Sequence, residues 1–218
     1  MQIKKSLLFA AVAFLAPVVL PAATISSNPT LSVGGLTFSN FGCSISKGGV
    51  FATPDMCNQI NVNTIPNPGL EITSGFFAAP LSFDDVALTY HLSSTFDIHE
   101  VGLSFNGSIF GLAISSVTES VYSGNTLVGM ATVSCGSALL GADCDLDDLA
   151  DNITLNGDYT NLTVKKDIQT TGVLGTAEAS IIDQTFNAPE PSSMALMGLG
   201  LLGAAGVLRR RVSKGAKA

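Results

Sequence analysis

The stretch Val86-Ala-Leu-Thr-Tyr-His-Leu92 decides the fold class of this 218-residue chain. Its large apolar residues alternate with small or polar ones, and this period of two is typical of a half-buried β-strand. A similar spacing of apolar residues returns at Ile98–Phe105 and at Val117–Tyr122. We therefore expect a β-strand in each of these segments, with one face of each strand directed towards a core.

Turn-forming residues separate the expected strands. Gly34-Gly35 predicts a bulge or a tight turn, Asn106-Gly107 a hairpin turn, and Ser123-Gly124-Asn125 a further turn. A second Asn-Gly pair stands at Asn156-Gly157, and the prolines in Asn61–Gly69 predict a loop. Sustained helical periodicity is confined to the two ends of the chain. Many short strands with frequent turns indicate an all-β protein, an antiparallel β-sandwich or a jelly-roll-like fold.

The N-terminus has the pattern of a secretory signal peptide. Lys4 and Lys5 precede the apolar run Leu7–Leu15, and the small residues Ala22-Ala23 follow. A basic segment, a short apolar segment and a small-residue exit are the three parts of such a peptide. We assign residues 1–23 to it and residues 24–183 to a β-rich ectodomain.

The C-terminus has the pattern of a membrane-targeted tail. The expected linker, residues 184–191, ends in Pro189, Glu190 and Pro191, and an uncharged apolar run reaches Leu208. Residues 192–208 are at the short end of the range that spans a bilayer as a helix. Arg209, Arg210 and Arg211 follow directly, and basic residues beside an apolar helix mark the cytoplasmic side. We therefore expect an external ectodomain and a basic cytoplasmic tail at 209–218.

The triplet, the short apolar helix and the arginine cluster together resemble a PEP-CTERM sorting signal. The resemblance implies a Gram-negative bacterial host that makes extracellular polysaccharide, and processing near the triplet by an exosortase, a membrane-embedded cysteine protease. The segments 88–94, 98–107 and 116–122 are in turn similar to the β-rich ectodomains of such proteins. That second similarity implies the fold and the setting, and it implies no activity.

The charge of the ectodomain excludes one class of partner. Between the two ends lie three lysines against sixteen of the seventeen acidic residues, a net charge of about −13. A surface with this balance repels a phosphate backbone, so we exclude nucleic acid as a partner. We expect no cofactor.

Four cysteines in an exported chain predict disulfides, because the compartments outside the cytoplasm are oxidising. Cys43, Cys57, Cys135 and Cys144 allow three connectivities. We favour Cys43–Cys57 and Cys135–Cys144, since each pair closes a short loop rich in turn residues. The competing zinc site lacks a Cys-x-x-Cys pair, and neither histidine stands at ligand spacing from a cysteine.

A catalytic constellation is not evident in the sequence. His91 and His99 bracket Asp97, but the chain has no Gly-x-Ser-x-Gly nucleophile motif. On the alternating pattern His91 points away from the side of Tyr90, and we expect it to face solvent. Carboxylate pairs for glycoside hydrolysis are set in space, so the sequence selects none.

The strongest metal candidate is an acidic segment near the fourth cysteine. Asp143, Asp145 and Asp147 alternate as at the start of a calcium loop, but the glycine and glutamate of an EF-hand are missing. Calcium binding here competes with the simpler interpretation of a solvated acidic loop.

Two classes of function fit these features. The first is an exported, non-catalytic cell-surface or extracellular-matrix protein, anchored in the membrane as a precursor, processed by an exosortase and associated with exopolysaccharide. The alternative is a secreted hydrolase that acts on glycans, or a carbohydrate-binding module. Carboxylates gathered in a cleft of the folded ectodomain would favour the hydrolase.

Overall fold

The computed structural model describes residues 22–50, 57–137, 139, 144 and 148–186. Almost all of these residues lie in antiparallel β-strands, which confirms the predicted all-β class. The strands are β1 (Ala23–Thr24), β2 (Leu31–Val33), β3 (Leu36–Gly49), β4 (Asn61–Ile65), β5 (Gly69–Ala78), β6 (Ser82–Ser123), β7 (Thr126–Gly136) and β8 (Ala150–Phe186). Two single 3₁₀ turns, Ile25–Ser27 and Cys57–Gln59, accompany them.

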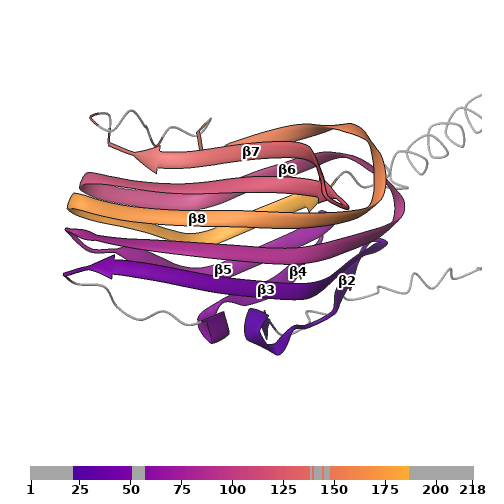
Figure 1. Ribbon diagram of the computed structural model, residues 1–218, viewed down its shortest axis with the longest axis horizontal. Helices are drawn as coiled ribbons and strands as arrows, with labels where there is room; N and C mark the ends of the chain where they lie inside the picture. The colour runs from indigo at the N-terminus through magenta and orange to yellow at the C-terminus, as the bar shows by residue number, and fades with distance from the viewer. Residues whose placement is uncertain (1–21, 51–56, 138, 140–143, 145–147, 187–218) are drawn as a thin grey trace, which may run out of the picture.

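Two very long strands organise the sheet. β6 has 42 residues and β8 has 37, and both pass from one layer of the molecule to the other. Residues 161–172 of β8 pair with residues 82–93 of β6 on one side and with residues 113–122 on the other. Beyond the bend, residues 174–186 of β8 pair with β5 and with residues 101–112 of β6. The sheet therefore curls over on itself (Figure 1).

The curled sheet has two layers. The first layer contains β2, β3, residues 82–94 and 113–123 of β6, residues 161–172 of β8, and β7. The second contains β1, β4, β5, residues 98–110 of β6, and residues 150–159 and 175–186 of β8. The core lies between them: the rings of Phe38, in the first layer, and Phe186, in the second, are 5.8 Å apart.

Glycine permits the bend between the layers. Gly111 of β6 has φ of +73° and pairs with Gly175 of β8. A Cβ on Gly175 would lie 2.0 Å from the Phe110 carbonyl oxygen, far inside contact distance. Side chains are therefore excluded where the two strands cross from one layer to the other.

The strand alternation predicted from the sequence is confirmed. Leu88, Tyr90 and Leu92 are buried and the intervening side chains face outwards. Gly34-Gly35 forms a tight turn between β2 and β3, and Gly124 supports the turn between β6 and β7 with φ of +59°.

Three expectations about turns and loops were wrong. Asn106-Gly107 lies inside β6, at a register shift against β8. The glycine therefore belongs to a bulge within the strand and not to a hairpin turn. The place of a Gly107 Cβ is occupied by the Phe105 ring, 2.4 Å away. Asn156-Gly157 likewise lies inside β8. Asn61–Ile65 is strand β4, paired with β5, and only the residues around the two prolines form a turn.

The outer limits of the domain differ slightly from the expected ones. Ala23 pairs with Val62 as part of β1, and β8 continues through Phe186, which is buried. Residues 184–186 of the expected linker therefore belong to the last strand. Residues 1–21 of the expected signal peptide, the sorting triplet, the expected transmembrane helix and the expected basic tail lie outside the described residues. Within the described ranges, no helix has the length and apolar character needed to cross a bilayer.

Candidate functional site

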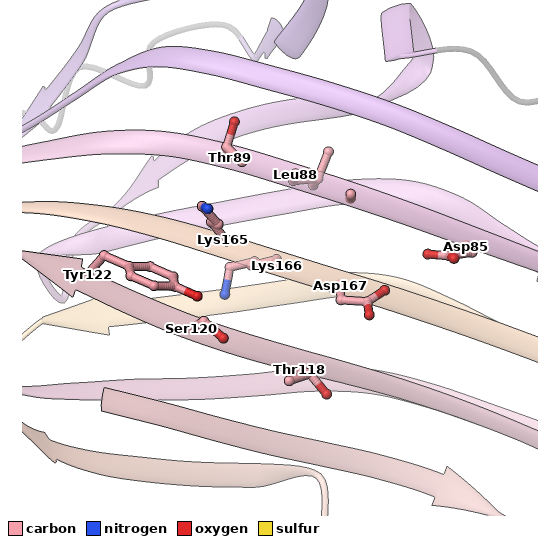
Figure 2. Close-up of a pocket in the computed structure, with 10 residues that line it drawn as sticks. Asp85, Leu88, Thr89, Thr118, Ser120, Tyr122, Lys165, Lys166 and Asp167 are labelled. Carbon is pink, nitrogen blue, oxygen red and sulfur yellow. The ribbon is translucent and has the colours of Figure 1, made fainter. Parts of the chain in front are cut away.

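A hollow of about 390 Å³ lies on the outer face of the first layer, and we call it the outer hollow. Its walls come from three neighbouring strand segments, the first and last parts of β6 on either side of the middle of β8 (Figure 2). The lining residues are Asp85, Ala87, Leu88, Thr89, Thr118, Ser120, Tyr122, Lys165, Lys166 and Asp167. Most of these side chains are polar.

Strand register arranges the outward side chains in rows. Thr89, Lys165 and Ser120 lie opposite one another across the three segments. Ala87, Asp167 and Thr118 form the next row. Because strands are about 4.8 Å apart, each row of three residues extends over roughly 10 Å of surface. The rows give the hollow the form of an extended platform.

Lys165 and Tyr122 form one end of the platform. The Lys165 ammonium lies 4.7 Å from the centroid of the Tyr122 ring, a cation–π contact. The two residues reach each other from adjacent strands, β8 and β6 (Figure 2). The pair combines an aromatic surface, a phenolic hydroxyl and a cation within one contact.

Asp85 and Asp167 form the other end. Partial burial raises the pKa of the Asp167 carboxyl above its ordinary value. A side-chain hydrogen bond with Asp85 and the negative charge of that carboxylate raise it further. Two carboxyl groups can share a hydrogen bond only when one of them holds the proton. This end of the hollow is therefore a carboxyl pair that retains a proton more readily than an isolated aspartate.

Beneath the hollow, the inward side of the same strands carries a buried polar cluster. Lys166 Nζ donates hydrogen bonds to Glu119 Oε2 and to Gln184 Oε1. The Gln184 side-chain amide donates to the Gly102 carbonyl oxygen at 3.0 Å. The Tyr90 hydroxyl, also buried, has its pKa raised well above the ordinary value by burial first and by the charge of Glu119 second.

A second hollow of about 180 Å³ lies on the outer face of the second layer. Gly102 forms its floor, since a Cβ there would meet Thr185 Oγ1 at 2.5 Å and Asn152 Oδ1 at 2.9 Å. Asp183 stands beside it, with a pKa raised by burial. This hollow has less than half the volume of the outer hollow and, unlike it, no aromatic residue and no lysine line it.

The structure contains both of the disulfides that the sequence favoured, Cys43–Cys57 and Cys135–Cys144. His91 lies on the outer face, opposite in direction to buried Tyr90, as expected. His99 instead faces Asp158, with 3.8 Å between His99 Nδ1 and a carboxylate oxygen. His91 in turn lies 3.5 Å from the Thr163 hydroxyl, measured from His91 Nδ1, so the two histidines of β6 face different residues of β8.

The calcium candidates Asp143, Asp145 and Asp147 lie outside the described residues, so calcium binding stays a prediction. In the part of the chain that the structure describes, no group of three or more His, Cys, Asp or Glu side chains is placed to hold a metal ion.

Sequence reasoning missed both the outer hollow and the buried cluster. The hollow joins residues separated by as many as 82 positions, from Asp85 to Asp167, and their juxtaposition depends on pairing that no local pattern encodes. The buried cluster did leave a signal. Lys166 stands at the inward position between Val164 and Ile168, and Glu119 at the inward position between Val117 and Val121. Opposite charges at apolar positions of two strands predict a buried contact.

Comparison with known proteins identifies the tail. Residues 187–211 match the family model described as the PEP-CTERM protein-sorting motif, so the chain carries this motif at its C-terminal end. The motif implies an exported precursor that an exosortase processes. A search of curated protein sequences found no match.

Among solved structures, the chain is similar to one entitled "Structure of TmCBM61 in complex with beta-1,4-galactotriose at 1.4 A resolution". The sequences are 10% identical, the similarity covers 66% of this chain and 88% of that one, and the TM-score is 0.35. A likeness at this level supports no conclusion about fold or ligand.

Proposed function

We propose that this protein, which carries a PEP-CTERM sorting motif, is a non-catalytic cell-surface or extracellular-matrix protein that holds exopolysaccharide in its outer hollow. The sorting motif at residues 187–211 is the observation that carries the export and processing part of the proposal. The two disulfides agree with a protein that matures in an oxidising compartment.

The chemistry of the outer hollow suits a sugar chain. Sugar rings present hydroxyl groups at their edges and apolar C–H groups on their faces. Thr89, Thr118 and Ser120 offer hydroxyl groups, Asp85 and Asp167 offer acceptors, and the Tyr122 ring offers an apolar surface. Sites for small polar ligands combine a few convergent hydrogen-bonding groups with aromatic surface in this way.

The charge of the protein selects the kind of polysaccharide. Of the three lysines in the described residues, Lys47 contacts Asp84 at 2.9 Å and Lys166 is buried against Glu119. Lys165 is thus the one lysine of this part of the chain that lies exposed on the platform. A domain with a net charge of about −13 repels a polyanion over distances set by the salt concentration. We therefore propose an uncharged polysaccharide as the ligand.

The geometry of the carboxyl pair favours binding over hydrolysis. Glycosidases hold their two catalytic carboxyl groups about 5–5.5 Å apart when they retain configuration and about 6.5–9.5 Å apart when they invert it. Asp85 raises the pKa of Asp167 through a side-chain hydrogen bond and through its charge, which indicates a pair in closer contact than either of these separations. The pair instead supports a role as a hydrogen-bonding platform.

Affinity electrophoresis tests the proposal. The mature protein is run through native gels that contain the host's own neutral exopolysaccharide fraction, and through gels without it. We expect the polysaccharide to slow the parent protein. Tyr122→Ala and Lys165→Ala should each reduce this retardation several-fold, because each removes one side of the platform. Phe110→Ala is the matched control, since this aromatic side chain is 79% exposed and stands at the bend, away from the hollow.

The outcomes separate the proposals. Equal retardation of the parent and of both hollow variants would place the binding elsewhere and refute the hollow as the site. Unretarded parent protein would refute polysaccharide binding and leave only the sorting role. Shortening of the polysaccharide by the parent protein, absent in an Asp85→Asn Asp167→Asn double variant, would support the hydrolase in its place.

A further inference from the structure

Lys166, Glu119 and Gln184 form a contact group in the core that the proposed function does not use. Lys166 and Glu119 are paired residues of neighbouring strand segments in the first layer, and Gln184 belongs to the second layer. All three side chains are buried, with exposures between 0% and 1%. Lys166 Nζ contacts an oxygen of each of the other two, so a primary amine, a carboxyl group and a carboxamide meet in an environment without water access.

Burial disfavours the charged form of the Lys166 side chain. Burial lowers the pKa of Lys166, while the charge of Glu119 and the hydrogen bond to it act in the opposite direction. An ammonium group has three N–H donors, and the described residues supply two acceptors to Lys166. A neutral amine has two N–H donors and a lone pair, which matches this count. Neutral amines are nucleophiles, whereas ammonium ions are not.

We propose that Lys166 and Gln184 become joined by an intramolecular isopeptide bond, with Glu119 as the general acid–base. Lys166 Nζ attacks Cδ of Gln184, the Nζ–Cδ bond forms, and the bond from Cδ to Nε2 breaks. The product is a secondary amide between the two side chains, and one molecule of ammonia leaves. The reaction needs no oxidant, reductant or external co-reactant.

Glu119 accounts for the protons. Its carboxylate takes one proton from the Lys166 ammonium to give the nucleophilic amine. Glu119 gives that proton to the departing Nε2, which leaves as ammonia, and accepts the second proton that Nζ loses as the new bond forms, so Glu119 ends the step protonated. Glu119 Oε2 already contacts Nζ, and Glu119 Oε1 has no hydrogen-bond partner among the described residues, so one oxygen is available for the transfer. This is the geometric requirement for a general base.

Gln184 is the group that Lys166 attacks because its carboxamide is held beside the Lys166 amine and carries no charge. Its Nε2 is held by the Gly102 carbonyl oxygen at 3.0 Å, which fixes the plane of the carboxamide with Oε1 towards Lys166. A carboxylate repels a nucleophile, and Glu119 is the residue that must carry the negative charge when Lys166 is protonated. The carboxamide has no such charge.

The bond would tie the two layers of the sheet together. Lys166 and Gln184 are 18 positions apart on β8, and the bend between the layers lies between them. A crosslink of this span restricts the unfolded chain and thereby stabilises the folded domain, as a disulfide does in the chain-entropy model. Gln184 also stands two residues before Phe186, where the sorting tail leaves the domain. If the protein is retained at the surface by its tail, force applied to the tail would be transmitted through this bond.

Intact-mass measurement of the denatured, reduced protein tests the proposal. Reduction opens the disulfides but leaves an amide intact. We expect the mature parent protein to be lighter than its polypeptide sequence by one ammonia. Lys166→Arg keeps a cation beside Glu119 but has no amine, and Glu119→Gln lacks the acid–base, so both should have the full sequence mass. Lys165→Arg, the neighbouring lysine on the outer face, should retain the loss.

Peptide mapping locates the missing ammonia. A succinimide at Asn106-Gly107 would give the same mass difference, so the measurement is repeated with Asn106→Ala. The proposal requires a branched peptide that contains both residue 166 and residue 184. A parent protein with the full sequence mass would overturn the proposal, and so would a loss that disappears with Asn106→Ala. Loss of one water in place of ammonia would make Glu119 the acceptor and would also overturn the assignment to Gln184.

Discussion

Phe186, the last residue of β8, packs its ring against Phe38 of β3 with 5.8 Å between the ring centroids. The contact joins the two layers at the point where the described domain ends. Phe38 also contacts Tyr90 edge-on, with 6.0 Å between the ring centroids and 65° between the ring planes, so three aromatic side chains meet here. The segment that leads to the sorting motif therefore begins from a buried strand end.

Truncation of Phe186 should destabilise the whole domain. The side chain is 3% exposed, and removal of a buried phenylalanine side chain typically costs about 3–5 kcal/mol. We expect Phe186→Ala to lower the free energy of unfolding by an amount in this range, measured by chemical denaturation. Phe110→Ala should change it by less than about 0.5 kcal/mol, because that ring is exposed. Equal effects of the two substitutions would contradict the packing described here.

The disulfides should each contribute to stability through the unfolded chain. Replacing Cys43 and Cys57 together by serine should lower the free energy of unfolding by about 2–4 kcal/mol. Thiol labelling of the denatured, unreduced parent protein should find no free thiol, because all four cysteines are bonded. Labelling at any of the four would count against the structure of this region.

The carboxyl pair should give the protein a recognisable pH dependence. The pKa of Asp167 is raised in the folded state by partial burial and by Asp85, so the fold binds this proton more tightly than the unfolded chain does. Its contribution to stability is therefore complete below the ordinary aspartate pKa of about 3.9 and is lost as pH rises through the raised value. Asp85→Asn removes the neighbouring charge. We expect this variant to lose less stability than the parent as pH rises from 4 towards neutrality.

Thermal unfolding measured across that pH range checks the expectation. Asp183, whose pKa is raised by burial alone, is present in both proteins and contributes the same slope to each. The difference between the two curves therefore reports on the pair. Parallel curves would mean that Asp85 does not influence Asp167.

The Phe105 ring fills the space beside Gly107 that a side chain there would need, and this gives a further prediction. A Cβ at residue 107 would lie 2.4 Å from that ring, and the ring is 5% exposed, so it has little room to move. We expect Gly107→Ala to destabilise the domain by about 1–3 kcal/mol, as overpacking in a core does. Gly124→Ala is less suitable as a comparison because of its positive φ; Gly75→Ala, with open space around the position, should have a smaller effect. A larger loss of unfolding free energy for Gly75→Ala than for Gly107→Ala would contradict the overpacking expected at residue 107.

Local sequence patterns predicted the strands but not their continuity. Leu88, Tyr90 and Leu92 are buried as their alternation indicated, because the period of side chains along a strand is a local property. Asn106-Gly107 predicted a hairpin wrongly because a hairpin and a bulge both favour a glycine, and only pairing with β8 distinguishes them. The prolines near residue 67 similarly predicted a loop over the whole segment, although β4 pairs with β5 up to Ile65, directly before the first proline.

The candidate site was less accessible to sequence reasoning than the fold. Asp85 and Asp167 meet because Ala87 pairs with Asp167, a register that depends on the bends in β6 and β8. The histidines were candidates because of their chemistry, yet the aspartate that faces His99 is the exposed Asp158, at 3.8 Å. The sorting signal, in contrast, is read from a linear order of residues and needs no folded structure.

The intact mass of the mature protein from its native host tests the central claim most directly. Because proline disfavours helix, we expect the prolines on either side of Glu190 to keep the triplet out of the helix expected after it, within reach of a membrane-embedded protease. We predict a mature C-terminus near Pro189–Pro191, with Arg209, Arg210 and Arg211 removed. Glu190→Ala should yield an exported, membrane-bound form that keeps the arginines. A parent protein whose C-terminus is still Ala218 would contradict a processed sorting signal and leave a permanent anchor in its place.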